Sequence, residues 1–118
     1  MVELLACLST GKGTWGHVAR LIADGTWDKI VLITNEFGKE KFTNEKNAIL
    51  VVIDNRKPVG ELVEDIKKGI SDNIKTKEVA LNLVSGDGKE HMAILSALQK
   101  LNIKFKPTAL TKDGIKEI

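Results

Sequence analysis

The chain alternates short apolar segments with longer polar stretches. Each apolar run has the length of a strand rather than of a helix, and the first four are nearly continuous in aliphatic side chains. Such runs are typical of strands that are buried on both faces of a parallel sheet. The fifth alternates apolar and basic residues at its start and contains Pro107, which favours an edge strand. The five runs are residues 2–8, 28–35, 48–53, 79–84 and 103–110.

Between these segments the apolar residues recur with a helical period. We expect one helix after the first strand, with Thr14 as its N-cap and Gly25 in the left-handed closing position. A second helix follows the third strand, and Pro58 suits its first turn. The polar stretch 36–46 is either a solvated connection or a short helix. The expected buried stripes of the three helices are Val18, Leu21 and Ile22, then Leu62, Val63, Ile66 and Ile70, then Met92, Leu95, Leu98 and Leu101.

Strands that alternate with helices give a mostly parallel sheet that is covered on both faces. We therefore expect an α/β fold, a single Rossmann-like three-layer sandwich over residues 1–118, with about five strands in the order 3-2-1-4-5. Residues 113–118 are expected to form a short tail. In this order strands one and four are neighbours whose connections leave in opposite directions. The crevice between these two connections, at the carboxyl ends of the strands, is where ligands bind in open α/β sheets.

Two polar loops that contain glycine follow strands one and four. The first loop spans residues 9–17 and the second loop spans residues 85–91. Each leads into a helix whose N-terminal amides favour an anion, and their hydroxyls and lysines suit a phosphate-bearing ligand. The alternative interpretation is that these glycines serve only the geometry of the turns. The candidate ligand-binding residues are Ser9, Thr10, Gly11, Lys12, Gly13, Asn35, Ser85, Gly86, Asp87, Gly88, Lys89 and His91.

The first loop matches neither of the two common nucleotide-binding fingerprints. A Walker motif needs a glycine where Ala6 stands, and a Ser or Thr where Gly13 follows Lys12. The glycines do have the form G-x-G-x-x-G, but a dinucleotide site also needs an acidic residue about 20 positions further on. Thr34 and Asn35 stand there instead. We therefore expect neither a Walker-type NTPase nor a dinucleotide-dependent enzyme.

The composition excludes several further classes of function but does not identify one. The formal net charge is +2, from 18 basic and 16 acidic residues, so no broad basic surface for duplex DNA is expected. The single cysteine, Cys7, excludes an intrachain disulfide and fits a reducing cytoplasm. No apolar run approaches the ~20 residues that cross a bilayer. His17, His91 and Asp87 lack the spacing of metal ligands, so neither a metal nor another cofactor is expected.

The end of the fourth strand and its loop carry a further pattern. Residues 82–98 resemble the second motif of CRISPR-associated Rossmann-fold (CARF) domains, in which Asn precedes Ser or Thr, a glycine pair, Lys and a helix rich in Met and Ala. The resemblance in topology covers the whole chain. One extra residue before the lysine, and Asp87 between the glycines, set this chain apart. The counterparts are Asn82, Gly86, Lys89, Met92, Ala93 and Ala97.

The resemblance implies a stand-alone nucleotide sensor of antiviral defence, a homodimer that binds cyclic oligoadenylate across its two-fold axis. Some members cleave the ring without a metal, because the ribose 2′-hydroxyl is an internal nucleophile. If this chain does so, Lys89 would stabilise charge on the phosphate, and Ser9 or Thr10 would position the reacting groups. Two alternatives stay open. One is a nucleotide- or nucleotide-sugar-binding subunit that needs a partner chain, and the other is a non-catalytic interaction domain.

Overall fold

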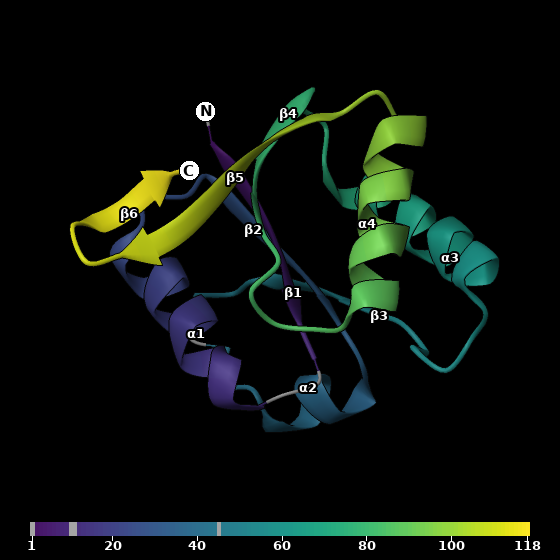
Figure 1. Ribbon diagram of the computed structural model, residues 1–118, viewed down its shortest axis with the longest axis horizontal. Helices are drawn as coiled ribbons and strands as arrows, with labels where there is room; N and C mark the ends of the chain where they lie inside the picture. The colour runs from purple at the N-terminus through teal and green to yellow at the C-terminus, as the bar shows by residue number, and fades with distance from the viewer. Residues whose placement is uncertain (1, 10–11, 45) are drawn as a thin grey trace.

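The computed structural model describes residues 2–9, 12–44 and 46–118. One six-stranded sheet has the order β3-β2-β1-β4-β5-β6, in which β1 to β5 are parallel neighbours and β6 is antiparallel to β5 (Figure 1). The expected α/β sandwich and the order 3-2-1-4-5 are therefore confirmed. Within the described ranges, no helix is long and apolar enough to cross a membrane. The elements are β1 (Glu3–Leu8), η1 (Lys12–Thr14), α1 (Trp15–Asp24), β2 (Lys29–Thr34), α2 (Glu36–Lys41), β3 (Ile49–Val52), α3 (Val59–Asn73), β4 (Glu78–Asn82), α4 (Gly88–Lys100), β5 (Lys104–Thr111) and β6 (Gly114–Glu117).

The sheet has a hydrophobic core on each face, with α1 and α2 on one side and α3 and α4 on the other (Figure 1). Successive residues of β1 alternate between the two cores. Leu5 and Cys7 pack with α3 and α4, whereas Leu4, Ala6 and Leu8 pack with α1. All five side chains are fully buried. This two-sided burial explains why the first apolar run of the sequence is continuous rather than alternating.

The buried face of α4 differs from the expected one. Met92 was expected in the buried stripe but is 64% exposed, and of the four residues of that stripe only Leu98 is fully buried. The buried side instead consists of Glu90, Ala93, Ile94, Ala97 and Leu98. The prediction was wrong because two helical stripes run along this segment. The stripe with two alanines faces α3 and the sheet, since small side chains allow the elements to approach closely.

The C-terminal residues form a strand rather than a tail. Residues 114–117 pair with the second half of β5, and Gly114 takes a φ of 101°, which suits glycine after the tight turn. The first half of β5 pairs with β4. The amide of Ile118 also donates to the carbonyl of Pro107 at 2.8 Å. The expectation that β5 is the edge strand was therefore wrong, because β6 covers part of its free side.

The ends of α1 differ from the expected caps, and the stretch after β2 contains a short helix. Gly25 has a φ of −84°, so it is not in the left-handed region, and the glycine instead leaves room for Trp27. A Cβ at position 25 would lie 2.3 Å from the indole nitrogen of Trp27, which donates to the carbonyl of Leu21. Thr14 does occupy the N-cap position of α1, but its side chain makes no capping hydrogen bond. The stretch 36–46 contains the short helix α2, capped by Asn35.

Candidate functional site

The two predicted loops meet at the carboxyl ends of β1 and β4. These strands are direct neighbours in the sheet, as the predicted order requires. The backbone amide of Ser9 donates to the hydroxyl of Ser85 at 3.1 Å, and both serines are buried. The two residues are 76 positions apart in the chain. A polar contact between them therefore fixes the loops against each other at the topological switch point of the sheet.

Glu90 is the centre of this arrangement, and the sequence interpretation did not single it out. Its side chain is fully buried, although it is a carboxylate. One oxygen, Oε1, accepts hydrogen bonds from the Ser9 hydroxyl at 2.6 Å and from the Asp87 amide at 3.0 Å. The other, Oε2, accepts from the side-chain amide of Asn55 at 3.4 Å. Burying a charge is costly unless such donors surround it, so Glu90 ties three loops into one polar cluster.

A capping box at the start of α4 accounts for part of that cluster. The Asp87 side chain accepts from the backbone amide of Glu90 at 2.8 Å, and the Glu90 side chain accepts from the Asp87 amide. The pattern Asp-x-x-Glu is the sequence signal that could have identified this cap. Because two carboxylates already face the first turn of α4, a phosphate would not bind deep at this helix N-terminus.

Gly86 of the second loop is held against the core. Gly86 has a φ of 101°, and a Cβ there would lie 2.6 Å from the Cys7 sulfur. The imidazole nitrogen Nε2 of His91 lies 2.8 Å from the carbonyl of Ser85. His91 therefore donates to that carbonyl, since a carbonyl oxygen can only accept. These contacts show that glycine at position 86 is required by its backbone conformation and by the lack of space.

Lys89 lies on the rim rather than between the loops. Its ammonium group donates to the carbonyl of Lys57 at 2.9 Å, on the loop that leads from β3 to α3. The same loop contains Arg56, which donates to Asp54 at 2.9 Å and holds the pKa of that carboxyl below its usual range. Lys57 itself forms an ion pair with Asp65 at 2.8 Å. Three cationic side chains thus gather at this rim, although each already has a partner.

The remaining predicted site residues are placed as follows. Thr10 and Gly11 lie outside the described residues, and Lys12 opens the short helix η1. Gly13 follows in η1 and is exposed, while Gly88 is the first residue of α4. Asn35 follows β2, next to the end of β1, because Leu8 and Thr34 are paired in the sheet. The described loop residues therefore all lie along the carboxyl edge of the sheet.

A second polar cluster links the start of α1 to β4 and β5. The side chain of Asn82 accepts from the amide of Val84 at 3.2 Å and donates to the carbonyl of Thr108 at 2.9 Å. These two contacts fix which end of the amide is the nitrogen. That nitrogen lies 3.1 Å from Nε2 of His17, so Nε2 must accept and the ring proton is on Nδ1. Asn82 and His17, both near the loops, therefore serve to hold the elements together.

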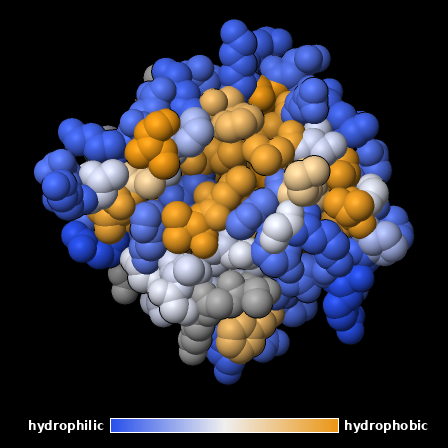
Figure 2. Space-filling view, in the orientation of Figure 1, coloured by the Kyte–Doolittle hydropathy of each residue, from blue (hydrophilic) through white to orange (hydrophobic). Residues whose placement is uncertain are grey.

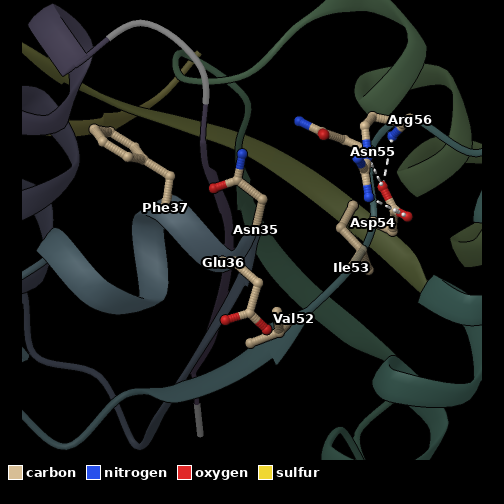
Figure 3. Close-up of a pocket in the computed structure, with 8 residues that line it drawn as sticks. All are labelled: Asn35, Glu36, Phe37, Val52, Ile53, Asp54, Asn55 and Arg56. Carbon is tan, nitrogen blue, oxygen red and sulfur yellow. Dashed lines mark hydrogen bonds and ion pairs between the residues drawn. The ribbon is translucent and has the colours of Figure 1, made fainter.

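A cavity of about 370 Å³ opens beside the polar cluster, at the carboxyl ends of β2 and β3 (Figure 3). It adjoins the cluster through Asn55, which lines the cavity and donates to Glu90. Its volume is near the lower end of the range for ligand pockets. The lining residues are Asn35, Glu36, Phe37, Val52, Ile53, Asp54, Asn55 and Arg56.

The thiol beneath the cluster is chemically inert at neutral pH. Burial raises the pKa of Cys7 from 9.0 to about 12, and the nearby Glu90 carboxylate adds to the effect of desolvation. At pH 8 a pKa of about 12 leaves roughly one thiolate in 10⁴, so native protein should not react with iodoacetamide. Cys7 is therefore a packing residue rather than a nucleophile.

The raised pKa also predicts how stability depends on pH. Above pH 9 the unfolded thiol loses its proton while the folded thiol keeps it, so the free energy of unfolding should fall with rising pH. The loss due to this group is about 1 kcal/mol per pH unit above pH 9 and ends near the raised pKa. Urea unfolding at pH 8, 9.5 and 10.5 should show a shallower decline for Cys7→Ala than for the unaltered chain. Identical slopes would contradict the prediction.

The fold and this edge define an α/β three-layer protein with a polar loop site at the switch point of its sheet. Among the described residues, no group of three His, Cys, Asp or Glu side chains is placed to hold a metal ion. Searches against protein-family models and against curated proteins found no match to the chain.

Proposed function

We propose that this chain is a cytoplasmic nucleotide sensor that binds a phosphate-bearing nucleotide, cyclic oligoadenylate in particular, at the carboxyl ends of β1 and β4. The observation that carries the proposal is the hydrogen-bonded junction between Ser9 and Ser85. It brings the first and second loops together in the crevice where open α/β sheets bind ligands. The choice of cyclic oligoadenylate rests on the resemblance of residues 82–98 to CARF domains.

The charges of the site favour a phosphate at its rim. Glu90 and Asp87 repel an anion from the interior of the cluster, whereas Lys89 lies outside it on the Lys57 carbonyl. Exchanging that neutral carbonyl for a phosphate oxygen would give the ammonium group a charge-assisted hydrogen bond. Lys89 is therefore the residue that we assign to the phosphate. Ser9 orders the loop, because its hydroxyl is buried against Glu90.

Cleavage of a bound ring would follow from the same placement. The ribose 2′-oxygen forms a bond to phosphorus, the bond from phosphorus to the 5′-oxygen breaks, and the 2′-hydroxyl proton ends on the leaving oxygen. The products are a 2′,3′-cyclic phosphate and a free 5′-hydroxyl. Lys89 would stabilise the charge that develops on the phosphate, which is the contribution that a fixed cation makes. Binding is the primary proposal, and cleavage depends on it.

An apolar surface next to the second loop supports the homodimer. Among the described residues, no helix covers the face of β5 beside α4, and Figure 2 shows a band of apolar side chains across it. Val84, directly before Ser85, is 43% exposed and Phe105 is 41% exposed, and both line a hollow on this face. A second copy related by a two-fold axis would cover the band and bring two second loops together. We expect a dimer in sedimentation analysis, and Phe105→Glu should shift it toward monomer.

Calorimetry with cyclic tetra-adenylate and cyclic hexa-adenylate tests the proposal. At least one ring should bind, and Lys89→Ala should weaken its affinity about 10- to 100-fold, as expected for a charge-assisted hydrogen bond. Lys100→Ala, at the other end of α4, is the matched control and should bind normally. If neither ring binds to the unaltered protein nor raises its melting temperature, the proposal fails. Equal affinities for the two lysine variants would remove Lys89 from the site.

A further inference from the structure

The two edges of the sheet differ in how they are protected against further pairing (Figure 1). At one edge, β5 and β6 carry charged side chains and a proline, which are the usual means by which proteins keep an exposed strand from pairing. These residues are Lys104, Lys106, Pro107, Lys116 and Glu117. The strand at the other edge, β3, contains neither a charge nor a proline, and none of its four aliphatic side chains is fully buried. This unprotected edge is therefore suited to pairing with another strand.

The backbone of β3 has a free outer side. The amide of Ile53 donates to the carbonyl of Thr34 on β2 at 2.8 Å. Because the backbone groups of successive residues point to opposite sides of a strand, those of Val51 also face β2, whereas those of Leu50 and Val52 face outward. Among the described residues, no strand lies beyond β3 and these outward groups have no hydrogen-bond partner. Two amides and two carbonyls are thus available to an added strand.

Asn44 closes the outer side of the chain just before this free segment. Its side-chain nitrogen donates to the carbonyl of Ala48, and its side-chain oxygen accepts from the amide of Ala48, both at 2.8 Å. These are the two bonds that a neighbouring strand would otherwise make with that residue. At the other end, the chain enters a turn after Asp54. The free segment is therefore residues 49–53, and Val51 is its midpoint.

The sequence of this segment is complementary to itself in an antiparallel arrangement. It reads Ile-Leu-Val-Val-Ile. With a two-fold axis at Val51, isoleucine lies opposite isoleucine, valine opposite valine, and Leu50 opposite the partner's Val52. Since Leu50 and Val52 have the outward backbone groups, each of these opposite pairs exchanges two hydrogen bonds. Every side chain also meets an aliphatic side chain on the same face of the sheet.

We propose that β3 pairs with β3 of a second copy, antiparallel and about a two-fold axis at Val51, so that the two sheets join edge to edge. A second copy fits because the free segment is symmetric in length and in sequence about that residue. The contact lies at the opposite edge of the sheet from the apolar band on β5, so one chain can make both contacts. Five paired residues bury less surface than a standard interface, so we expect weak association that increases with protein concentration.

Sedimentation of variants that also carry Phe105→Glu isolates this contact from the one on β5. Phe105→Glu alone should be monomeric at low concentration and should associate through β3 as the concentration rises. Adding Val52→Lys should weaken that association about 10-fold, because each copy then places a lysine in the paired segment. Val59→Lys, at an exposed valine that starts α3, is the matched control and should associate normally. Equal association of the two lysine variants would overturn the proposal.

A cysteine at the axis tests the register of the pairing. Opposite residues of a non-hydrogen-bonded antiparallel pair have Cα atoms about 4.5 Å apart, which a disulfide can span. Val51→Cys should therefore form a disulfide-linked dimer when diamide is added as the oxidant. Val52→Cys should form little, because residue 52 lies opposite the partner's Leu50 and about 7–8 Å from its own counterpart. Cys7 does not compete, since it is buried.

Sedimentation and cross-linking together decide the proposal, once melting temperatures show that each variant is folded. If Phe105→Glu stays monomeric at every concentration and Val51→Cys gives no linked dimer, a second copy does not occupy this edge. Equal cross-linking of Val51→Cys and Val52→Cys would overturn the pairing about Val51. Selective cross-linking of Val51→Cys, with association lost in Val52→Lys, supports it. Neither measurement uses a nucleotide, so ring binding by the loops stands or fails separately.

Discussion

Replacing Glu90 with alanine should lower the free energy of unfolding by about 4 kcal/mol, since two short hydrogen bonds to a charged acceptor contribute roughly 1.5–3 kcal/mol each. The substitution removes the acceptor for the Ser9 hydroxyl and for the Asp87 amide, and it leaves both donors beside an empty space. It also removes half of the capping box of α4. Urea unfolding at neutral pH gives the measurement.

Two further variants test whether the loss of stability comes from the buried Glu90 carboxylate or from the removal of any negative charge. Glu64 of α3 is exposed, so Glu64→Ala should change the free energy of unfolding by less than about 0.5 kcal/mol. Glu90→Gln keeps one acceptor oxygen for Ser9 and Asp87 and should cost only about 1 kcal/mol. Its new amide would face the amide nitrogen of Asn55, so the Asn55 side chain should turn over. Equal losses for Glu90→Ala and Glu64→Ala would contradict the role of Glu90.

Much of the fold follows from local patterns in the sequence. Aliphatic runs predict buried strands, and the stripe Leu62, Val63, Ile66 and Ile70 is buried on α3 as expected. The strand order follows from the rules for parallel strands with helical connections, which leave few arrangements. The strand β6 was missed because Gly114 and two charged residues give it only one apolar side chain, Ile115. Its stability comes from pairing with β5, which no local pattern shows.

The candidate site was predictable only at the level of the loops. Their meeting follows from the neighbouring positions of β1 and β4, and the structure places Ser9 against Ser85. The burial of Glu90 was not predictable, because a glutamate in the first turn of a helix is normally exposed even where it completes a capping box. Its burial requires donors that are 81 and 35 positions away in the chain, Ser9 and Asn55. The cavity was missed for the same reason, since its walls come from two connections that are distant in sequence.

The orientation of α4 gives the second large prediction. Ile94 is fully buried between the sheet and α3, so Ile94→Ala should lower the free energy of unfolding by about 3 kcal/mol through lost burial and the cavity left behind. Met92→Ala should change it by less than about 0.5 kcal/mol, because the Met92 side chain is 64% exposed. Thermal and urea unfolding of the two variants at low protein concentration give the comparison. A larger loss for Met92→Ala would mean that the stripe expected from the sequence is the one that packs.

The same two variants, measured at several protein concentrations, test whether the exposed face of α4 belongs to a dimer interface. Ile94 belongs to the core of one chain, so its contribution should not depend on concentration. Met92 lies on the outer side of the same helix, and its truncation would begin to lower the melting temperature at high concentration if a second copy covers it. A constant, small effect of Met92→Ala at every concentration, in a chain that sediments as a dimer, would place Met92 outside the interface. The contact would then be confined to Val84, Phe105 and the rest of the apolar band on β5.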